Sequence, residues 1–204
     1  MTESRSIFFV DTDEETRKQL QEVAAIMKVS LQVFSHGESF LRAFKSGPGC
    51  LVTELRIQDM SGVELQQRIG DMGSKLPIIF VSEHLETHLI VRALQNGAIT
   101  VLTKPIGKQE IWDAVSTSLD RDREIRRFDA QQQKLQNRLQ SLTSQEKEVL
   151  DLMMKGLPNK VIAKRLDVSK RTIESRRHHI FKKTHTDSLA DLIKLVISSE
   201  WHLP

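Results

Sequence analysis

The sequence predicts an α/β doubly wound domain with a five-stranded parallel sheet, followed by an all-α domain of four helices. The first 119 residues alternate short apolar runs with segments of helical spacing, the pattern of βα units that form a parallel sheet. The last 62 residues contain helical patterns alone. At 204 residues the chain is long enough for two small domains, each with a core of ordinary size.

Five short apolar runs are the expected strands. They are Ile7–Val10, Leu31–Phe34, Cys50–Thr53, Pro77–Val81 and Thr100–Leu102. A doubly wound sheet places its ligand site at the carboxyl ends of its strands, where the strand order reverses. The candidate site residues are therefore the polar residues at these ends: Asp11, Thr12, Glu54, Ser82 and Lys104.

Five segments with helical spacing lie between and after these strands. In the first of them, Leu20, Val23 and Met27 fall on one face of a helix. Ser35 and Glu38 have the spacing of a capping box, so we expect Ser35 to cap the second helix. The expected helices are Glu14–Met27, Glu38–Phe44, Val63–Ile69, Thr87–Gln95 and Lys108–Leu119.

The segment 120–140 is expected to form one solvated helix, because it is rich in Arg, Asp, Gln and Lys and contains neither Gly nor Pro. Its apolar residues fall on the a and d positions of a heptad repeat. These positions hold Ile125, Phe128, Gln132, Leu135, Leu139 and Leu142, of which Gln132 alone is polar. Two interpretations fit the pattern: a helix that dimerises, and a connector whose apolar stripe packs on a neighbouring domain.

Capping signals divide the last part of the chain into four helices. The signals are a capping box of Thr143 and Glu146, a stop at Gly156, and caps at Ser169 and Ser188. A turn at Asp167 and Val168 joins the second helix, near Asn159–Leu166, to the third, Lys170–Thr184. Two helices joined in this way form a helix-turn-helix unit, whose second helix enters the major groove of DNA.

Charge is distributed unevenly along the chain. Residues 1–119 carry 12 Lys and Arg against 15 Asp and Glu, whereas residues 141–204 carry 12 against 8. The basic C-terminal end suggests a polyanionic partner, and double-stranded DNA fits. The third C-terminal helix has an outward surface with cations for phosphates and with groups that can contact base edges. That surface contains Lys170, Arg171, Glu174, Ser175, Arg177, His178, Lys182 and Lys183. The alternative is a solvated charged face of a small helix bundle.

Several classes of protein are excluded. No stretch approaches the roughly 18 apolar residues that a membrane-spanning helix needs, and Ile7–Val10 is too short for a signal peptide. Cys50 is the only cysteine, so the chain has no internal disulfide. We therefore expect a cytoplasmic protein without a membrane partner. His178, His179 and His185 have no Cys or carboxylate at ligand spacing, so neither a metal site nor an enzyme activity is expected.

The C-terminal part contains a set of short motifs. It comprises Leu142–Leu150, Gly156, Asn159-Lys160, Ile162-Ala163, Leu166, Val168-Ser169, Arg171–Glu174 and Lys182-Lys183. Over nearly all of residues 142–199 this pattern resembles the LuxR-type DNA-binding domain. The resemblance implies base contacts by Glu174, Ser175 and His178, and phosphate contacts by Lys170, Thr172, Arg177 and Lys182. It also implies a homodimer formed through the fourth helix, where we expect Leu192 and Val196 to form an exposed apolar face.

The N-terminal part carries a second set of motifs. They are Val10-Asp11, Leu55-Arg56, Asp59–Leu65, Gly97-Ala98 and Lys104-Pro105, and they are similar to those of a receiver domain. The resemblance implies a flavodoxin-like or CheY-like fold. Together the two parts resemble response regulators of the FixJ/NarL type. The implied organisation is a receiver domain at 1–120, a helical linker at 121–141 and a helix-turn-helix domain at 142–204.

The receiver motifs depart from the family pattern where phosphorylation takes place. A receiver domain phosphorylates an aspartate after its third strand, with magnesium held by two acids after the first strand. Here Glu54 replaces that aspartate, and Thr12 follows Asp11 in place of the second acid. Val101 stands where the family has a switching aromatic residue, whereas Ser82 and Lys104 match the usual hydroxyl and lysine. Because divalent cations are retained chiefly by carboxylates, magnesium would be held weakly, and we expect no cofactor.

Three hypotheses follow for Glu54. In the first, the Glu54 carboxylate reaches Lys104 and Ser82 and mimics the phosphorylated state. In the second, Glu54 forms a structural ion pair in a scaffold that no longer switches. In the third, phosphorylation persists on Glu54 or Asp59. The sequence favours a sequence-specific DNA-binding transcription regulator that does not depend on phosphorylation. The alternatives are a conventional phosphorylation-switched response regulator and a protein-interaction adaptor that has lost DNA binding. No feature of the sequence identifies a sensor kinase.

Overall fold

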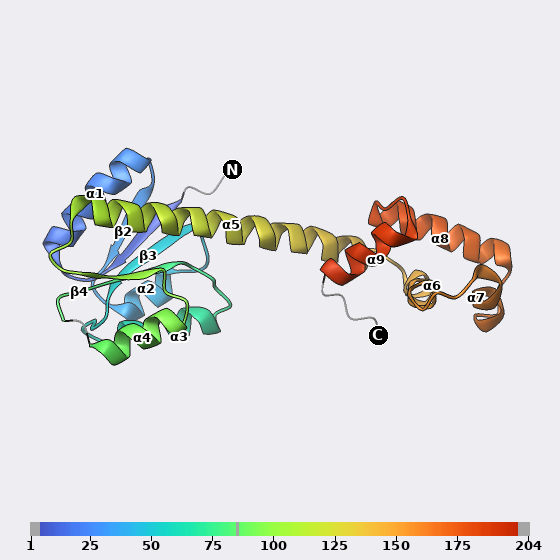
Figure 1. Ribbon diagram of the computed structural model, residues 1–204, viewed down its shortest axis with the longest axis horizontal. Coiled ribbons are helices and arrows are strands. Elements are labelled where there is room, and N and C mark those ends of the chain that lie inside the picture. The colour runs from blue at the N-terminus through green and yellow to red at the C-terminus, as the bar shows by residue number, and fades with distance from the viewer. Residues whose placement is uncertain (1–4, 85, 200–204) are drawn as a thin grey trace. The chain divides into compact units, whose positions relative to one another are not determined.

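The structure is a computed structural model that describes residues 5–84 and 86–199 of the chain. The first four and last five residues of the expected domains therefore lie outside the described residues. The chain forms two compact units, Met1–Arg126 and Arg127–Pro204, and each is considered by itself below. Figure 1 shows the sheet with its helices in the first unit and the helical second unit.

The first unit contains the expected five-stranded parallel sheet. Its strands are β1 (Ser6–Val10), β2 (Ser30–Phe34), β3 (Gly49–Glu54), β4 (Ile78–Ser82) and β5 (Thr100–Thr103). They lie in the order β2-β1-β3-β4-β5 and every neighbouring pair is parallel. Because β1 and β3 are neighbours at the centre, the residues that follow them meet at one edge of the sheet. The doubly wound fold is confirmed.

Alternation along the strands sends side chains to two cores. Ile7 and Phe9 of β1 are buried on the face that packs against α1 (Glu14–Met27) and α5 (Lys108–Gln140). Phe8 and Val10 are buried on the opposite face. That face is covered by α2 (Gly37–Ala43), α3 (Gly62–Asp71) and α4 (Thr87–Gln95). Both faces are buried at β1, β3 and β4, which explains why these three strands are mostly apolar without alternation.

The cap of α2 differs from the expectation. Ser35 does not cap this helix, whose N-cap residue is His36 and makes no side-chain cap hydrogen bond. Instead the carboxylate of Asp59 accepts hydrogen bonds from the backbone N–H groups of Gly37 and Glu38, both at 2.9 Å. The loop after β3 thus satisfies donors of a helix that lies 21 or more residues earlier in the chain. The capping box predicted for Ser35 is wrong because a tertiary partner occupies that helix end.

Helix α5 continues through the predicted border at residue 120. Expected as two segments, it runs unbroken for 33 residues because no Gly or Pro interrupts it. Asp122 is buried, and its carboxylate accepts hydrogen bonds from the backbone N–H of Gly49 at 3.1 Å and from Nε of Arg126 at 2.9 Å. Arg126 in turn donates to the carbonyl oxygen of Gly47. These contacts fasten α5 to the loop before β3.

The apolar heptad positions of α5 are divided between the two units. Ile125 lines a pocket of the first unit. Leu139 and Leu142 are fully or almost fully buried in the core of the second unit, where Leu135 also packs. Phe128 is 58% exposed. The packed positions agree with the connector interpretation, and dimerisation through this helix stays a prediction.

The second unit is helical, as expected. Its further helices are α6 (Ser144–Met154), α7 (Asn159–Arg165), α8 (Lys170–Thr184) and α9 (Leu189–Ser198). The capping box of Thr143 and Glu146 is confirmed, and the hydroxyls of Ser169 and Ser188 cap α8 and α9. Gly156 follows α6 with a φ of +74°, a conformation that glycine adopts without strain. The predicted helix-turn-helix pair corresponds to α7 and α8.

We predict that Asp122→Ala destabilises the first unit by about 2–3 kcal/mol, because a buried N–H and a guanidinium lose their partner. Asp120→Ala is the matched control, since Asp120 forms only an exposed (i,i+3) pair with Arg123. It should change stability by less than about 0.5 kcal/mol. Urea unfolding of the full chain, followed at the methyl NMR signals of Ile7 and Ile79, measures both. Equal effects of the two substitutions would contradict the role of Asp122.

Candidate functional site

Three charged side chains meet at the carboxyl ends of the strands. Asp11 follows β1, Glu54 ends β3 and Lys104 follows β5. The ammonium of Lys104 lies 2.6 Å from Oδ2 of Asp11 and 3.0 Å from Oε2 of Glu54. The three side chains are 10–14% exposed, so water screens these contacts less than it screens surface pairs. The prediction that these three strand-end residues lie close together is therefore correct.

Backbone donors complete this cluster. Oδ1 of Asp11 accepts from the backbone N–H of Thr12 at 2.6 Å, and Oε1 of Glu54 accepts from that of Leu55 at 2.8 Å. Each carboxylate thus has one oxygen on the ammonium and one on the backbone. Burial by itself would lower the pKa of Lys104, but its hydrogen bonds to Asp11 and Glu54 and their charges outweigh burial and raise it. The lysine is therefore a cation at neutral pH.

Asp13 lies at the margin of the cluster. Its Oδ2 is 4.0 Å from the ammonium of Lys104, and the same carboxylate caps α1 by accepting from the backbone N–H of Thr16. Burial alone would raise the pKa of Asp13, but the hydrogen bonds from Thr16 and the charge of Lys104 lower it. Asp13 therefore acts mainly as the N-cap residue of α1.

The other candidate residues of the strand ends have separate partners. Ser82 is buried and its hydroxyl donates to the carbonyl oxygen of His84 at 3.2 Å. The structure contains no Glu54–Ser82 hydrogen bond among its described residues, so that part of the expectation is wrong. Thr12 is exposed. Val101 packs, half-buried, against the core that α2, α3 and α4 cover.

The donor set does not fit magnesium. Within residues 5–84 and 86–199, no group of three or more His, Cys, Asp or Glu side chains is arranged to hold a metal ion. Asp11 and Glu54 already bind the Lys104 ammonium, and Thr12 contributes no negative charge. Hard divalent cations need several oxygen ligands, chiefly carboxylates.

Helix α8 presents a polar surface on one side and an apolar face on the other. Ile173 and Ile180 are fully buried in the core of the second unit. Of the seven predicted DNA contacts, five are exposed and two, Thr172 and Arg177, are half-buried. The exposed ones are Lys170, Glu174, Ser175, His178 and Lys182. All seven thus lie outside the core.

Some side chains on this surface of α8 have contacts within the second unit. The hydroxyl of Thr172 lies 2.8 Å from that of Ser169, the cap of the helix. Lys170 and Glu174 form an (i,i+4) ion pair at 3.5 Å, with both side chains more than half exposed. The guanidinium of Arg177 lies 5.9 Å from the centre of the Phe181 ring. These contacts are weak enough to be exchanged for contacts with a ligand.

Glu146 has two structural roles, of which the sequence predicted only the capping box. It completes the capping box of α6 and also binds the Lys183 ammonium of α8 at 2.6 Å. Burial would raise its pKa, but the hydrogen bonds from Lys183 and Thr143 lower it. Lys183, predicted on the outward surface of α8, therefore fixes α8 against α6. The separation of 37 residues left no local signal for this pair.

The expected apolar face of α9 is wrong. Leu192 and Val196 are 0% and 5% exposed and belong to the core of the second unit. Ile197, one residue further, is 71% exposed, and Ile193 is half-buried. The sequence could not separate the two faces, because Leu192 with Val196 and Ile193 with Ile197 have the same (i,i+4) spacing.

No helix within the described residues is both long enough and apolar enough to cross a lipid bilayer.

Comparison with protein families assigns each of the two units to a family. Residues 7–116 match the response regulator receiver domain. Residues 140–196 match the bacterial regulatory proteins of the LuxR family.

Two transcriptional regulatory proteins match this chain over most of their length. The transcriptional regulatory protein FixJ of Rhizobium meliloti is 32% identical over 195 residues, which cover 95% of each chain. The transcriptional regulatory protein TdiR of Thauera aromatica is 33% identical over 198 residues, which cover 97% of this chain and 87% of the relative.

Solved structures give the same result. The response regulator StyR has a TM-score of 0.85 and 34% sequence identity, covering 95% of this chain and 98% of its own. Full-length FixJ from B. japonicum has a TM-score of 0.56 and 27% identity, covering 98% of both chains. The chain therefore belongs to the FixJ/NarL-type response regulators, with a receiver domain and a LuxR-type DNA-binding domain, and is a transcription regulator of that family.

Proposed function

We propose that this response regulator is a cytoplasmic, sequence-specific DNA-binding protein whose activity does not depend on phosphorylation. The observation that carries the proposal is the Lys104–Glu54 contact at 3.0 Å. In phosphorylated receiver domains the corresponding lysine contacts a phosphoryl oxygen. Here the carboxylate of Glu54 supplies an anion to that lysine without phosphate, through a charge-assisted hydrogen bond. The domain limits 1–120, 121–141 and 142–204 are part of this proposal.

Two alternatives assign phosphorylation to a carboxylate of the first unit. Both oxygens of Glu54 are engaged, one by Lys104 and one by the backbone of Leu55. Both oxygens of Asp59 accept hydrogen bonds from the N-terminus of α2. Burial would raise the pKa of Asp59 and the hydrogen bonds to Glu38 and Gly37 lower it, so the carboxylate is stabilised where it is. These hydrogen bonds support the proposal over phosphorylation of either carboxylate.

We predict that Glu54→Gln lowers the affinity for operator DNA by up to about a hundredfold. The substitution preserves shape but removes the charge that binds Lys104, an interaction worth about 1.5–3 kcal/mol. Fluorescence anisotropy on a duplex selected from random DNA measures the effect. Glu22→Gln is the control, because Glu22 forms only an exposed ion pair with Lys108 and should leave affinity unchanged. An unchanged affinity of Glu54→Gln would favour a scaffold that does not switch.

Phosphorylation itself can be tested on the same protein. Magnesium and a small-molecule phosphodonor are added, and the protein mass and operator affinity are measured together. We expect neither a gain of one phosphoryl group nor a change in affinity. A gain of one phosphoryl group with a matching rise in affinity would establish the conventional switch instead.

We also propose that α8 reads DNA as the family pattern implies, with Glu174 at a base edge and Lys182 at a phosphate. Both side chains are exposed on the same surface of the helix. Glu174→Ala should relax the preference at one base position, by about 1–3 kcal/mol of discrimination. Lys182→Ala should weaken all duplexes alike and reduce the salt slope by about one. The reverse outcome would mean that the helix is rotated in the groove. Absence of any salt-dependent DNA binding would favour the adaptor.

The proposed homodimer uses the outer face of α9 in place of Leu192 and Val196. Its exposed centre is Ile197, with Ile193 one turn earlier. We predict that Ile197→Glu shifts the full chain from dimer to monomer in analytical ultracentrifugation with operator DNA, because a charge enters an apolar contact. Val161→Glu, at a 45% exposed position on α7, should leave the dimer intact. A dimer that survives Ile197→Glu but not Phe128→Glu would place the interface on the connector.

A further inference from the structure

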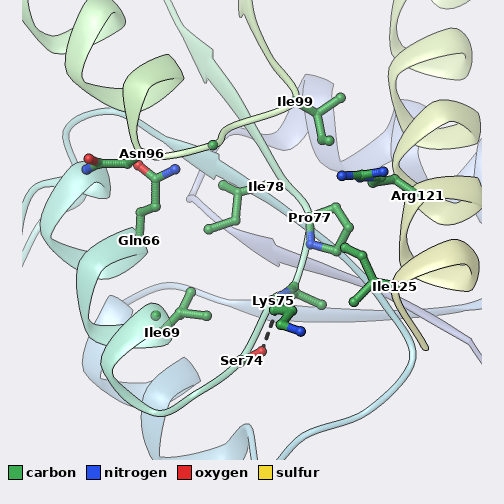
Figure 2. Close-up of a pocket in the computed structure, with 13 residues that line it drawn as sticks. Gln66, Ile69, Ser74, Lys75, Pro77, Ile78, Asn96, Ile99, Arg121 and Ile125 are labelled. Carbon is green, nitrogen blue, oxygen red and sulfur yellow. Dashed lines mark hydrogen bonds between the residues drawn. The ribbon is translucent and has the colours of Figure 1, made fainter. Parts of the chain in front are cut away.

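A pocket of about 400 Å³ lies in the first unit, at the amino ends of β4 and β5. It is therefore at the opposite edge of the sheet from Asp11, Glu54 and Lys104. Its walls come from the C-terminal part of α3, the segment before β4, the loop between α4 and β5, and helix α5. Figure 2 shows Arg121 and Ile125 of α5 on one side of the pocket and Gln66 and Asn96 on the other.

The lining is apolar with a positive edge. Its apolar part consists of Ile69, Leu76, Pro77, Ile78, Ile99 and Ile125. Lys75 and Arg121 are its two cations, and none of the 13 described lining residues is acidic. A cavity of this size, apolar with a few polar groups, has the composition of small-molecule sites.

Gln66 lines the pocket and carries a polar atom that is unsatisfied within the described residues. The residue is only 7% exposed, and its Nε2 donates to the carbonyl oxygen of Ala93 at 3.1 Å. Its Oε1 is buried and has no hydrogen-bond partner in the described part of the chain. Leaving a buried acceptor without a donor costs about 1–3 kcal/mol. Less than 1 Å² of this oxygen is exposed, so it does not open into the pocket and takes no part in the proposed binding.

Arg121 can exchange its present partner for a ligand. Its guanidinium lies 3.3 Å from Oε2 of Glu124, and the two side chains are 58% and 70% exposed. An exposed (i,i+3) pair of this kind contributes little to stability. A guanidinium at the edge of an apolar pocket binds a carboxylate through two parallel hydrogen bonds.

We propose that this pocket binds a small organic carboxylate, with its apolar body among the isoleucines and its carboxylate at Arg121. The assignment does not depend on how Glu54 acts. It has a consequence for signalling, because Arg121 and Ile125 flank Asp122, the residue that fastens α5 to the loop before β3. A bound carboxylate adds contacts between α5, α3 and the α4–β5 loop. Occupancy of the pocket is thus coupled to the helix that continues beyond the first unit.

The test uses the full chain with ¹³C-labelled isoleucine methyl groups. Octanoate and benzoate are titrated to about 10 mM, above the roughly millimolar dissociation constant of a weak small ligand. Four reporters line the pocket: Ile69, Ile78, Ile99 and Ile125. Ile7, Ile173 and Ile180 lie in other cores and serve as internal controls. We expect saturable shifts of the four reporters alone, with octanamide and benzamide binding about tenfold more weakly.

Two pairs of variants test the location and the charge. Gly70 lines the pocket on α3, and a Cβ there would meet no atom within 4 Å. Gly70→Phe should fill the pocket and abolish the shifts, whereas Gly70→Ala should leave them. Arg121→Gln should remove the preference for carboxylate over amide. Arg123→Gln, on the same helix but outside the lining, should not.

The proposal is overturned by any of three results. The first is no saturable shift of the four reporters with either carboxylate. The second is equal shifts of the control isoleucines, and the third is undiminished binding to Gly70→Phe with its fold intact by the control methyl signals. Arg121→Gln with an unchanged carboxylate preference would overturn the assignment of the anionic group. None of these results bears on the Glu54 experiments, so the two proposals fail separately.

Discussion

The ammonium of Lys104 is the contact on which the strand-end edge of the receiver sheet depends. Because β1 and β3 are neighbours, Asp11 and Glu54 converge there, and two poorly solvated carboxylates repel each other. Lys104 lies within 3.0 Å of both and removes that repulsion without a bound metal ion. One internal cation, at the position of the family's usual lysine, thus pairs with both acids.

The two edges of the sheet consequently have opposite electrostatic character. At the carboxyl edge the acids are satisfied by Lys104 and by backbone N–H groups. At the amino edge, two cations line an apolar pocket that has no acid among its described residues. Helix α5 passes this second edge and is fastened beside it through Asp122. A change at the amino edge therefore acts on α5 directly, whereas the cluster at the carboxyl edge lies at the far end of the strands.

In the second unit, too, a single charged side chain holds two elements in place. Glu146 accepts from the backbone at its own helix terminus and binds Lys183 of α8, so one carboxylate sets both the start of α6 and the position of α8. Ile173 and Ile180 hold the opposite face of α8 in the core. Rotation of α8 about its axis would break both sets of contacts. The polar residues of α8 for which we propose DNA contacts are therefore fixed in direction by Glu146, Ile173 and Ile180.

The sequence by itself determined the elements, because strand and helix periodicity and the hydroxyl caps of α6, α8 and α9 act within a few residues. It also determined that Asp11, Glu54 and Lys104 meet, since parallel strands end at one edge. Only the tertiary structure decided the Asp59 cap of α2, the Glu146–Lys183 pair and the pocket at the amino ends of β4 and β5. It likewise decided that Leu192 and Val196, and not Ile197, face the core. These features depend on contacts between residues far apart in the chain, for which a single sequence carries no local pattern.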